Sequence, residues 1–347
     1  MSFAVRSASP ITEREELIAV LERNFEYDFP VRAHYKWRHE DNPAGPGWSW
    51  VIYDRQSGAI GAVTSLFPRP MYLDGKLAMV GQVAQFAVDH AYRSLGPAMM
   101  LQRATFEPVD SGTLAMCYDC PPHDHGMSTF VRLGLRPTCQ VDRYVLMLRS
   151  DEIVEKTVGK NFWAKPLIAG ANLLLKLQQR KRRIPGLEIH RLDGRFDEEF
   201  THLDKIVPSS GIIRCSRSAE LLNWRYRDSF DSNNEVLVAR EGGELVAFLA
   251  LNIYELHDQK RACISDLFGR KLNQTGLALI DAAIEMCHQR NIVCLEGHCS
   301  ETSELMQLFE AFRFRPRELT ARVVPYVKSG RQDASLCWPL AQAEVLA

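Results

Sequence analysis

The feature that most constrains the fold is a weak repeat, in which segments of the first half of the chain recur in the same order in the second half. A Trp-Arg pair in HYKWRHEDNP, at Trp37, returns in LLNWRYRDSF, at Trp224. The apolar runs VIYDRQSGAIGAV return as VLVAREGGELVAF, and TFVRLGLRP returns as LFEAFRFRP. Such a period is too long for a solenoid unit and indicates two copies of one domain.

Each copy mixes helical and strand-like patterns in an order that predicts an α+β fold. In the first half a capping box at Thr12 and Glu15 opens a helix, and β-rich runs follow between about 48 and 88. A helix, a strand, a short helix and a last strand come next. We expect a first domain at 1–150, a helical linker at 151–186, a second domain at 187–330 and a C-terminal tail at 331–347.

Composition places the chain among ordinary soluble proteins. Its 347 residues exceed one average domain, and the formal net charge of −1 provides no global attraction for nucleic acid. Nine cysteines, an odd number, indicate reduced thiols rather than a disulfide framework. The N-terminal segment MSFAVRSASPITEREEL lacks a signal-peptide core, and no run of about 20 apolar residues could span a membrane. We expect a cytoplasmic protein.

The stretch YRSLGPAMML, at 92–101, follows the strand-like GQVAQFAV and begins a helical pattern. Backbone N–H groups are unpaired at a helix start and the dipole is positive there, so such an end binds phosphate when small residues permit close approach. Arg93, Gly96 and Ala98 give an Arg-x-x-Gly-x-Ala spacing. The alternative is an ordinary helix start, since proline is favoured in the first turn.

The segment VDHAYRSLGPAMML resembles the acetyl-coenzyme A motif of the GNAT (GCN5-related N-acetyltransferase) superfamily. That motif is a strand ending in Val, then Arg/Gln-x-x-Gly-x-Gly/Ala and a helix. The turn LGLRP, at 133–137, is similar to the Leu-Gly-Phe-x-Pro ending common in the family. The resemblance covers about 3–148 well and 187–328 in outline. It implies two tandem GNAT-like domains, each with a mostly antiparallel sheet flanked by helices, the second copy being degenerate.

The resemblance also implies an N-acetyltransferase that uses acetyl-coenzyme A as co-substrate. The helix start would hold the pyrophosphate, Arg93 would add charge, and the strand end would offer backbone groups to the pantetheine arm and polarise the thioester carbonyl. An amine would then attack directly in a ternary complex. The implied binding residues are Phe86, Val88, Arg93, Ser94, Leu95, Gly96, Ala98 and Met99.

Several positions depart from the family pattern. Pro97 has no N–H, so one donor is absent from the loop. Val131 stands where the family often has a tyrosine that protonates the leaving thiolate. In the second copy Gly276 is present without the motif's spacing, and Arg313 replaces the glycine of the C-terminal turn. We therefore expect the second domain to shape a substrate cleft or an interface rather than to bind its own acetyl-coenzyme A.

The segment CYDCPPHDH, at 117–125, offers two functional interpretations. Cys117, Cys120, His123 and His125 have zinc-ligand chemistry, but structural zinc sites draw ligands from two separated knuckles, which disfavours a metal. The position of the loop after the strand beside the pantetheine arm favours catalysis instead, with cap and turn roles as the alternative. A role of Cys120 as an acyl-carrying nucleophile is a less favoured interpretation, because most of the GNAT superfamily transfers the acyl group directly. The candidate catalytic residues are Tyr118, His123, Asp124 and His125.

Two glutamines precede the motif on its strand. Gln82 and Gln85 lie where glutamate is the commoner base, so they would only orient an amine or water, or form a cross-strand pair. Tyr35, Trp37 and Arg38 lie where the family places a substrate-gating helix. The echo of the Trp-Arg pair in the second copy favours a packing role for them.

The acceptor is expected to be a small-molecule amine held between the domains, such as an amino sugar or an amino acid conjugate, with a peptide also open. The segment 162–183, apolar and then basic, fits either a helix on a membrane surface or one packed across the two domains. Two other functions stay open. One is a non-catalytic acyl-coenzyme A-binding or regulatory protein, and the other is tRNA-dependent aminoacyl transfer to an envelope precursor.

Overall fold

The computed structural model describes residues 3–26, 29–121, 124–151, 154, 157, 164–177, 184–230, 233–300 and 303–328. The chain forms two compact units, each made of separate segments. Unit 1 comprises Met1–Gln140, Pro208–Ser232 and Ala321–Trp338, and unit 2 comprises Val141–Val207, Asn233–Thr320 and Pro339–Ala347. The expected boundaries at 150, 186 and 330 refer to the copies in the sequence and stay predictions.

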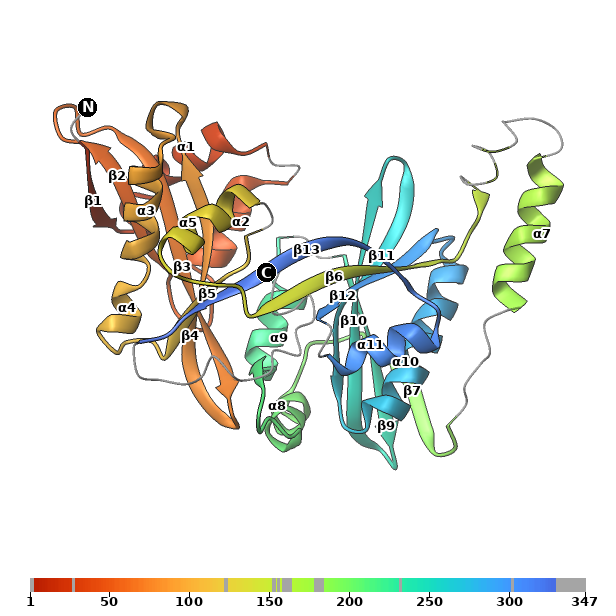
Figure 1. Ribbon diagram of the computed structural model, residues 1–347. Helices are drawn as coiled ribbons and strands as arrows, with labels where there is room; N and C mark the ends of the chain where they lie inside the picture. Colours follow the sequence, from red (N-terminus) through yellow and green to blue (C-terminus); the bar gives the residue numbers. More distant parts are fainter. Residues whose placement is uncertain are drawn as a thin grey trace. The chain divides into compact units, whose positions relative to one another are not determined.

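Unit 1 contains a sheet in the order β1-β2-β3-β4-β5-β13 (Figure 1). β8 also pairs with β3. The described pairs of this sheet are antiparallel except β4 with β5. The strands are β1 Phe3–Ala8, β2 Trp48–Asp54, β3 Ile60–Leu73, β4 Lys76–Val88, β5 Met116–Asp119, β8 Ile213–Cys215 and β13 Arg315–Tyr326, which enters unit 1 at Ala321.

Helices pack on both faces of this sheet. On one face, α1 (Arg14–Asn24) and α2 (Val31–His39) cover a core that includes Val51 and Val63. α1 buries Leu17, Ile18, Val20 and Leu21, one stripe of a helix of 3.6 residues per turn. On the other face lie α3 (Leu95–Ala104) and α4 (Glu107–Asp110), over a core that includes Leu101 and Val109. The short 3₁₀ helix η1 (His90–Tyr92) and α5 (Asp124–Arg132) also belong to the first copy.

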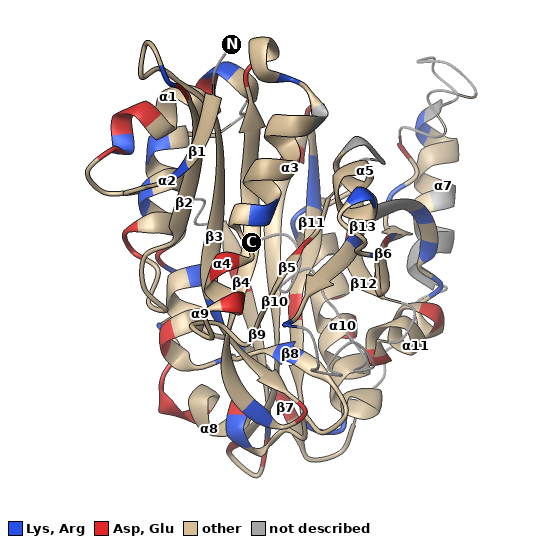
Figure 2. Cartoon of the chain, turned by 60° about the vertical axis from the view of Figure 1, so that its left-hand side comes forward, with Lys and Arg blue, Asp and Glu red and all other residues tan. Residues whose placement is uncertain are grey.

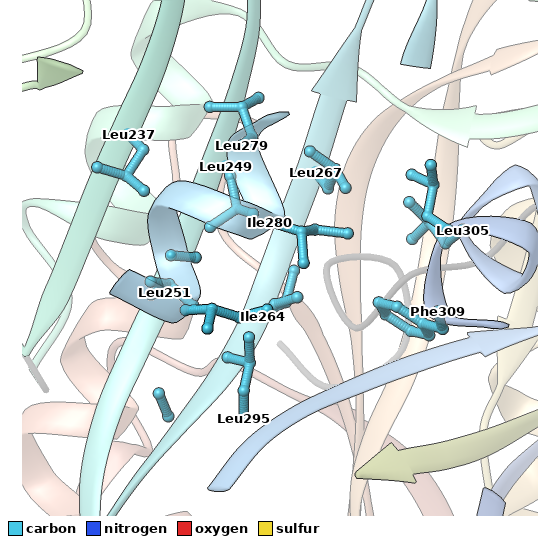
Figure 3. Packing of buried hydrophobic residues seen from close by; sticks show 14 of the residues in the cluster. Leu237, Leu249, Leu251, Ile264, Leu267, Leu279, Ile280, Leu295, Leu305 and Phe309 are labelled. Atoms are coloured by element: carbon cyan, nitrogen blue, oxygen red, sulfur yellow. The ribbon is translucent and has the colours of Figure 1, made fainter. Parts of the chain in front are cut away.

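Unit 2 contains a second sheet in the order β6-β12-β11-β10-β9-β7, in which the described pair β11–β12 is parallel. Its strands are β6 Cys139–Met147, β7 Leu187–Arg191, β9 Asn234–Glu241, β10 Glu244–Leu256, β11 Gln259–Gly269 and β12 Cys294–Ser300. α10 (Leu272–Gln289) and α11 (Glu304–Ala311) cover one face, where Leu249, Leu267 and Ile280 meet in the core (Figure 3). α8 (Glu198–Ile206) contacts β10, and its Phe200 packs against Phe248.

The two copies exchange their last strands. β6 closes the first copy in the sequence, yet Val141 to Met147 pair antiparallel with β12 in the sheet of unit 2. β13 closes the second copy, yet Val324 to Tyr326 pair with β5 in the sheet of unit 1. Each sheet therefore depends on a strand from the other copy, which explains why the compact units differ from the sequence copies.

The Trp-Arg echo marks a symmetric contact inside unit 1. α9 (Ala219–Tyr226) belongs to this unit, and its Trp224 stacks on Trp37 of α2 with ring centroids 4.5 Å apart. Trp37 Nε1 donates to the Trp224 carbonyl at 2.8 Å, and Trp224 Nε1 donates to the Trp37 carbonyl at 3.0 Å. This reciprocal pairing supports the packing role predicted for these residues.

α7 (Ala164–Leu177) covers part of the segment 162–183, whose remaining residues lie outside the described part of the chain. Asn172 connects α7 with the segment that follows β6, because its Oδ1 accepts hydrogen bonds from the N–H and hydroxyl of Ser150 at 2.7 and 2.8 Å. None of the described helices is both long enough and apolar enough to cross a membrane.

Candidate functional site

The start of α3 lies where the motif predicts it, at the end of β4. Ser94 is the N-cap residue in extended conformation, and its side chain makes no capping hydrogen bond. The first intrahelical hydrogen bond runs from the Ala98 N–H to the Ser94 carbonyl, so the N–H groups of Leu95 and Gly96 lie before the first intrahelical donor, and Pro97 has no N–H. Gly96 is exposed, and a Cβ atom built on it would meet nothing within 4 Å. No acidic residue lies in the first turn (Figure 2), so the helix start is open to an anion.

The segment between β4 and α3 is fixed by contacts with α1 and with β3. Asp89 N–H donates to the Gly61 carbonyl at 2.8 Å, and the Asp89 carboxylate accepts from Arg23 at 2.8 Å and from Asn24 Nδ2 at 2.6 Å. The Tyr92 ring lies over Gly61, where a Cβ would come within 2.2 Å of it. The missing side chain of Gly61 thus makes room for the turn that precedes α3.

Arg93 is exposed and contacts the end of β4. Its Nε donates to the Val88 carbonyl at 3.0 Å, and one terminal nitrogen donates to Asn24 Oδ1 at 3.3 Å. Because the guanidinium group has five N–H donors, these bonds leave donor capacity beside the helix start. The sequence did not indicate that Arg93 would bind the very carbonyl that we assigned to the pantetheine arm.

β4 and β5 pair in parallel over only a short stretch in the middle of β4. Their register covers Val80 to Gln82 opposite Met116 to Tyr118, while β4 continues to Val88. On its other edge β4 has a bulge, because Ala87 pairs with Val63 and Ala84 with Ser65, which leaves one extra residue on β4. Gln85 in the bulge has a left-handed φ of 56°. A bulge and a divergent neighbour redirect backbone groups that a regular ladder would use.

The predicted strand residues lie along this divergent end. Phe86 is partly buried and packs on the core beneath α3, and Val88 pairs with Ala62 of β3. On α3, Ala98 and Met99 are partly buried, while only the backbone of Leu95 is described. The structure therefore brings the eight predicted binding residues to one junction, the end of β4 and the first turn of α3.

The end of β5 contains a titratable group that the sequence analysis passed over. Asp119, the last residue of β5, accepts a hydrogen bond from the Cys120 N–H, and burial raises its pKa to about 7. In a sequence, an aspartate after a strand is typical of a turn. Only the divergence of β4 from β5, which begins one residue earlier at Tyr118, connects Asp119 with the site.

The other candidates from this segment are Tyr118, His123, Asp124, His125 and Cys120, and the structure describes only some of their side chains. Tyr118 is buried, with 1% of its surface exposed. His123 lies outside the described residues, and Asp124 and His125 begin α5 with only their backbone described, so their catalytic roles stay predictions. Burial raises the pKa of the Cys120 thiol well above its usual value, which disfavours the thiolate that a nucleophile requires.

Val131, at the position of the family's tyrosine, is 59% exposed on α5. Among the described residues, which exclude His123, no three or more His, Cys, Asp or Glu gather as metal ligands do. The prediction that this site holds no metal is not tested by that finding.

Gln82 and Gln85 each have a side-chain hydrogen-bond partner on α2. Arg38 donates to Gln82 Oε1 at 3.3 Å, and His39 Nε2 lies 2.9 Å from Gln85 Oε1. The guanidinium carbon of Arg38 lies 4.2 Å from the centroid of the Phe67 ring. Two consecutive residues of α2 thus contact both glutamines of β4.

No protein-family model and no curated protein matches the sequence. Solved structures match it over most of its length. A GCN5-related N-acetyltransferase from Anabaena variabilis is 13% identical, with a TM-score of 0.66 over 94% of this chain and 73% of the other. A GCN5-related N-acetyltransferase from Kribbella flavida is 12% identical, with a TM-score of 0.59 over 94% and 71%.

A third match is the Saccharomyces cerevisiae N-myristoyltransferase with bound myristoyl-CoA. It is 13% identical, with a TM-score of 0.59 over 94% of this chain and 82% of the other. At this level of identity the likeness concerns the fold, and it confirms the expected α+β architecture with two related domains. The chain therefore has the GCN5-related N-acetyltransferase (GNAT) fold in two tandem copies.

Proposed function

We propose that the chain is an acyl-coenzyme A-dependent N-acyltransferase, with acetyl-coenzyme A as its donor and a small amine as its acceptor. The observation that carries the proposal is the junction at which the bulged, divergent end of β4 meets the open first turn of α3. Solved structures with this fold include N-acetyltransferases and an N-myristoyltransferase with bound myristoyl-CoA. These neighbours support an acyl-coenzyme A donor in general, and acetyl is our choice among acyl groups.

The residues of the junction suit the donor chemically. The N–H groups of Leu95 and Gly96 and the positive end of the α3 dipole would bind the pyrophosphate, and Arg93 would add a charge-assisted contact. The open space around Gly96 permits the close approach that N–H donors require. The backbone at Phe86 and Val88 would bind the pantetheine arm and polarise the thioester carbonyl.

In the proposed reaction a neutral amine nitrogen attacks the thioester carbonyl carbon. The new N–C bond forms as the C–S bond breaks, the nitrogen gives up one proton to a base, and the departing thiolate takes up one proton. Asp119 is the described candidate for the base, because a carboxylate with a pKa of about 7 is half ionised at neutral pH. His123, Asp124 and His125 remain predicted alternatives.

Binding and transfer can be tested separately. Mass spectrometry of the protein purified from cells should detect co-purified coenzyme A, and calorimetry with acetyl-coenzyme A should give a one-to-one complex. A screen of amino sugars and amino acid conjugates should then release free thiol. Absence of binding at millimolar ligand would overturn the proposal. Binding without transfer to any amine would instead favour a regulatory protein that kept the fold.

The role of Asp119 predicts a pH dependence. kcat/KM should rise with pH and level off above about 7, since the ionised carboxylate is the active form. Asp119→Asn should remove this dependence and lower the plateau by about 10²-fold or more. Asp110→Asn, which removes a carboxylate bonded to Tyr326, is the matched control and should keep the profile. An unchanged profile in Asp119→Asn would assign the base to another residue.

A further inference from the structure

The bulge of β4 contains a residue in a conformation that its side chain disfavours. Gln85 has a φ of 56°, in the left-handed region that glycine adopts without steric penalty. The bulge of β11 in unit 2 provides a comparison: Ser265 is the extra residue there, and it does not have a positive φ. The left-handed residue is thus a property of the first copy, and something in unit 1 has to hold it.

The contact that holds Gln85 comes from the last residue of α2. His39 is fully buried, its ring stacks on Tyr35 with centroids 4.1 Å apart, and the Phe67 ring meets it edge-on at 4.7 Å. Its Nε2 lies 2.9 Å from Gln85 Oε1. A side chain fixed by two aromatic rings makes a rigid hydrogen-bond partner, because little rotamer freedom remains to be lost.

The ionisation of His39 decides what it does in this contact. Burial and the neighbouring Arg38 lower its pKa to about 4, so the ring is neutral at physiological pH. The amide oxygen of Gln85 only accepts, hence the proton lies on Nε2 and the ring donates. Nδ1 is buried and has no hydrogen-bond partner among the described residues. His39 is therefore suited to holding an atom in place and unsuited to transferring protons.

Arg38, the residue before His39, makes a parallel contact. It donates to Gln82, which is the last residue of β4 that pairs with β5. The end of α2 thus contacts β4 at the two points that shape the site, where the strand leaves β5 and where it bulges.

We propose that His39 is a positioning residue, whose Nε2–H group holds Gln85 in the left-handed conformation and so fixes the β4 backbone that would polarise the thioester. The inference rests on the proposed acyltransferase function. It predicts that loss of the hydrogen bond lowers the rate of transfer and leaves donor binding almost unchanged, because the pyrophosphate contacts lie on α3.

Three variants separate this role from simple packing. His39→Phe keeps an aromatic ring and removes the donor, and should lower kcat about tenfold while KM for acetyl-coenzyme A changes less than about twofold. His39→Gln places an N–H donor near the position of Nε2 and should recover most of the rate. The double variant His39→Phe, Gln85→Gly should have a higher kcat than His39→Phe alone, because glycine adopts a positive φ without support.

A second measurement reports on the conformational stability of the bulge and does not depend on enzymatic turnover. Hydrogen exchange of the amides in 83–88 should be faster in His39→Phe than in the wild type, with the thermal midpoint used to correct for global stability. The pH profile of kcat/KM should keep its shape in His39→Phe. An unchanged kcat and exchange rate would overturn the inference. Loss of the pH dependence of kcat/KM in His39→Phe would also overturn it and would make His39 a proton-transfer residue. Faster exchange in a protein that binds no coenzyme A would contradict the proposed function alone.

Discussion

The two copies of the fold begin the helix after their bulged strand in different ways, and one glycine in each copy marks the difference. Gly96 in α3 is exposed, with nothing within 4 Å of the place where a Cβ would be. Gly276 in α10 is buried, and a Cβ there would come within 2.8 Å of Leu308. The first glycine thus leaves an opening at the surface, while the second lets two helices approach each other.

The strands before these helices are much more alike. β11 also has one extra residue opposite β10, and its register with β12 ends at Ile264 although the strand continues to Gly269. The bulge and the divergence are therefore shared by both copies. What differs is the helix start: Arg270 and Lys271, beside the start of α10, form ion pairs with Glu244 and Glu241. The difference suggests that the helix start, more than the sheet, decides which copy can bind a phosphate.

The largest expected effect comes from closing the opening at Gly96. In Gly96→Val the branched side chain would cover the first-turn N–H groups and weaken binding of acetyl-coenzyme A by about 100-fold or more, because at least two hydrogen bonds to a charged group are lost. Since a Cβ at this position meets no atom within 4 Å and the site is exposed, the thermal midpoint should stay close to that of the wild type. Calorimetry and thermal unfolding measure the two quantities. Retained binding would mean that the phosphate loop has been misplaced.

Gly276→Val is the matched control in the other copy. It should lower the free energy of unfolding by about 1–3 kcal/mol, because the new side chain overlaps Leu308 in a filled core. Binding of acetyl-coenzyme A should not change. If Gly276→Val weakened binding as much as Gly96→Val does, the assignment of the donor site to the first copy alone would fail.

The sequence predicted those parts of the fold that depend on local patterns. The helix start near Gly96, the strand before it and the repeat around Trp37 and Trp224 follow from periodicity, turn residues and similarity. The exchange of β6 and β13 was not predicted, because nothing within a strand such as CQVDRYVLM specifies which distant edge it will join. The capping box was wrong: α1 begins at Arg14, and Glu13 accepts a hydrogen bond from the Ser9 N–H.

In the candidate site, too, residues with a local sequence signal were predicted and residues that act through distant contacts were not. The motif supplied Arg93 and Gly96 because their spacing is local. Asp119 and His39 were missed, since their roles arise from contacts between segments far apart in the chain: His39 meets β4 from α2, and Asp119 lies where β4 and β5 diverge. The paired glutamines on β4 gave a partial signal, as polar residues in a buried strand need partners, but the sequence did not identify those partners.

The smallest expected effect concerns the turns after α5 and α11, where the copies agree in conformation and differ in residue. Gly134 and Arg313 both have a left-handed φ, at 80° and 63°. In each turn the following residue donates its N–H to the carbonyl of a phenylalanine five residues before it, at 2.9 Å, as in a Schellman motif. Arginine pays a steric penalty in this conformation that glycine avoids.

Arg313→Gly should therefore raise the free energy of unfolding by about 0.5–1 kcal/mol, and Gly134→Arg should lower it by about the same amount. The second change is a clean test of conformation, because a Cβ at position 134 would meet no atom within 4 Å. Urea unfolding of both variants, with donor binding measured alongside, provides the comparison. A loss of stability in Arg313→Gly would mean that the arginine side chain contributes more through its contacts than its backbone conformation costs, and the two turns would then differ in what holds them as well as in sequence.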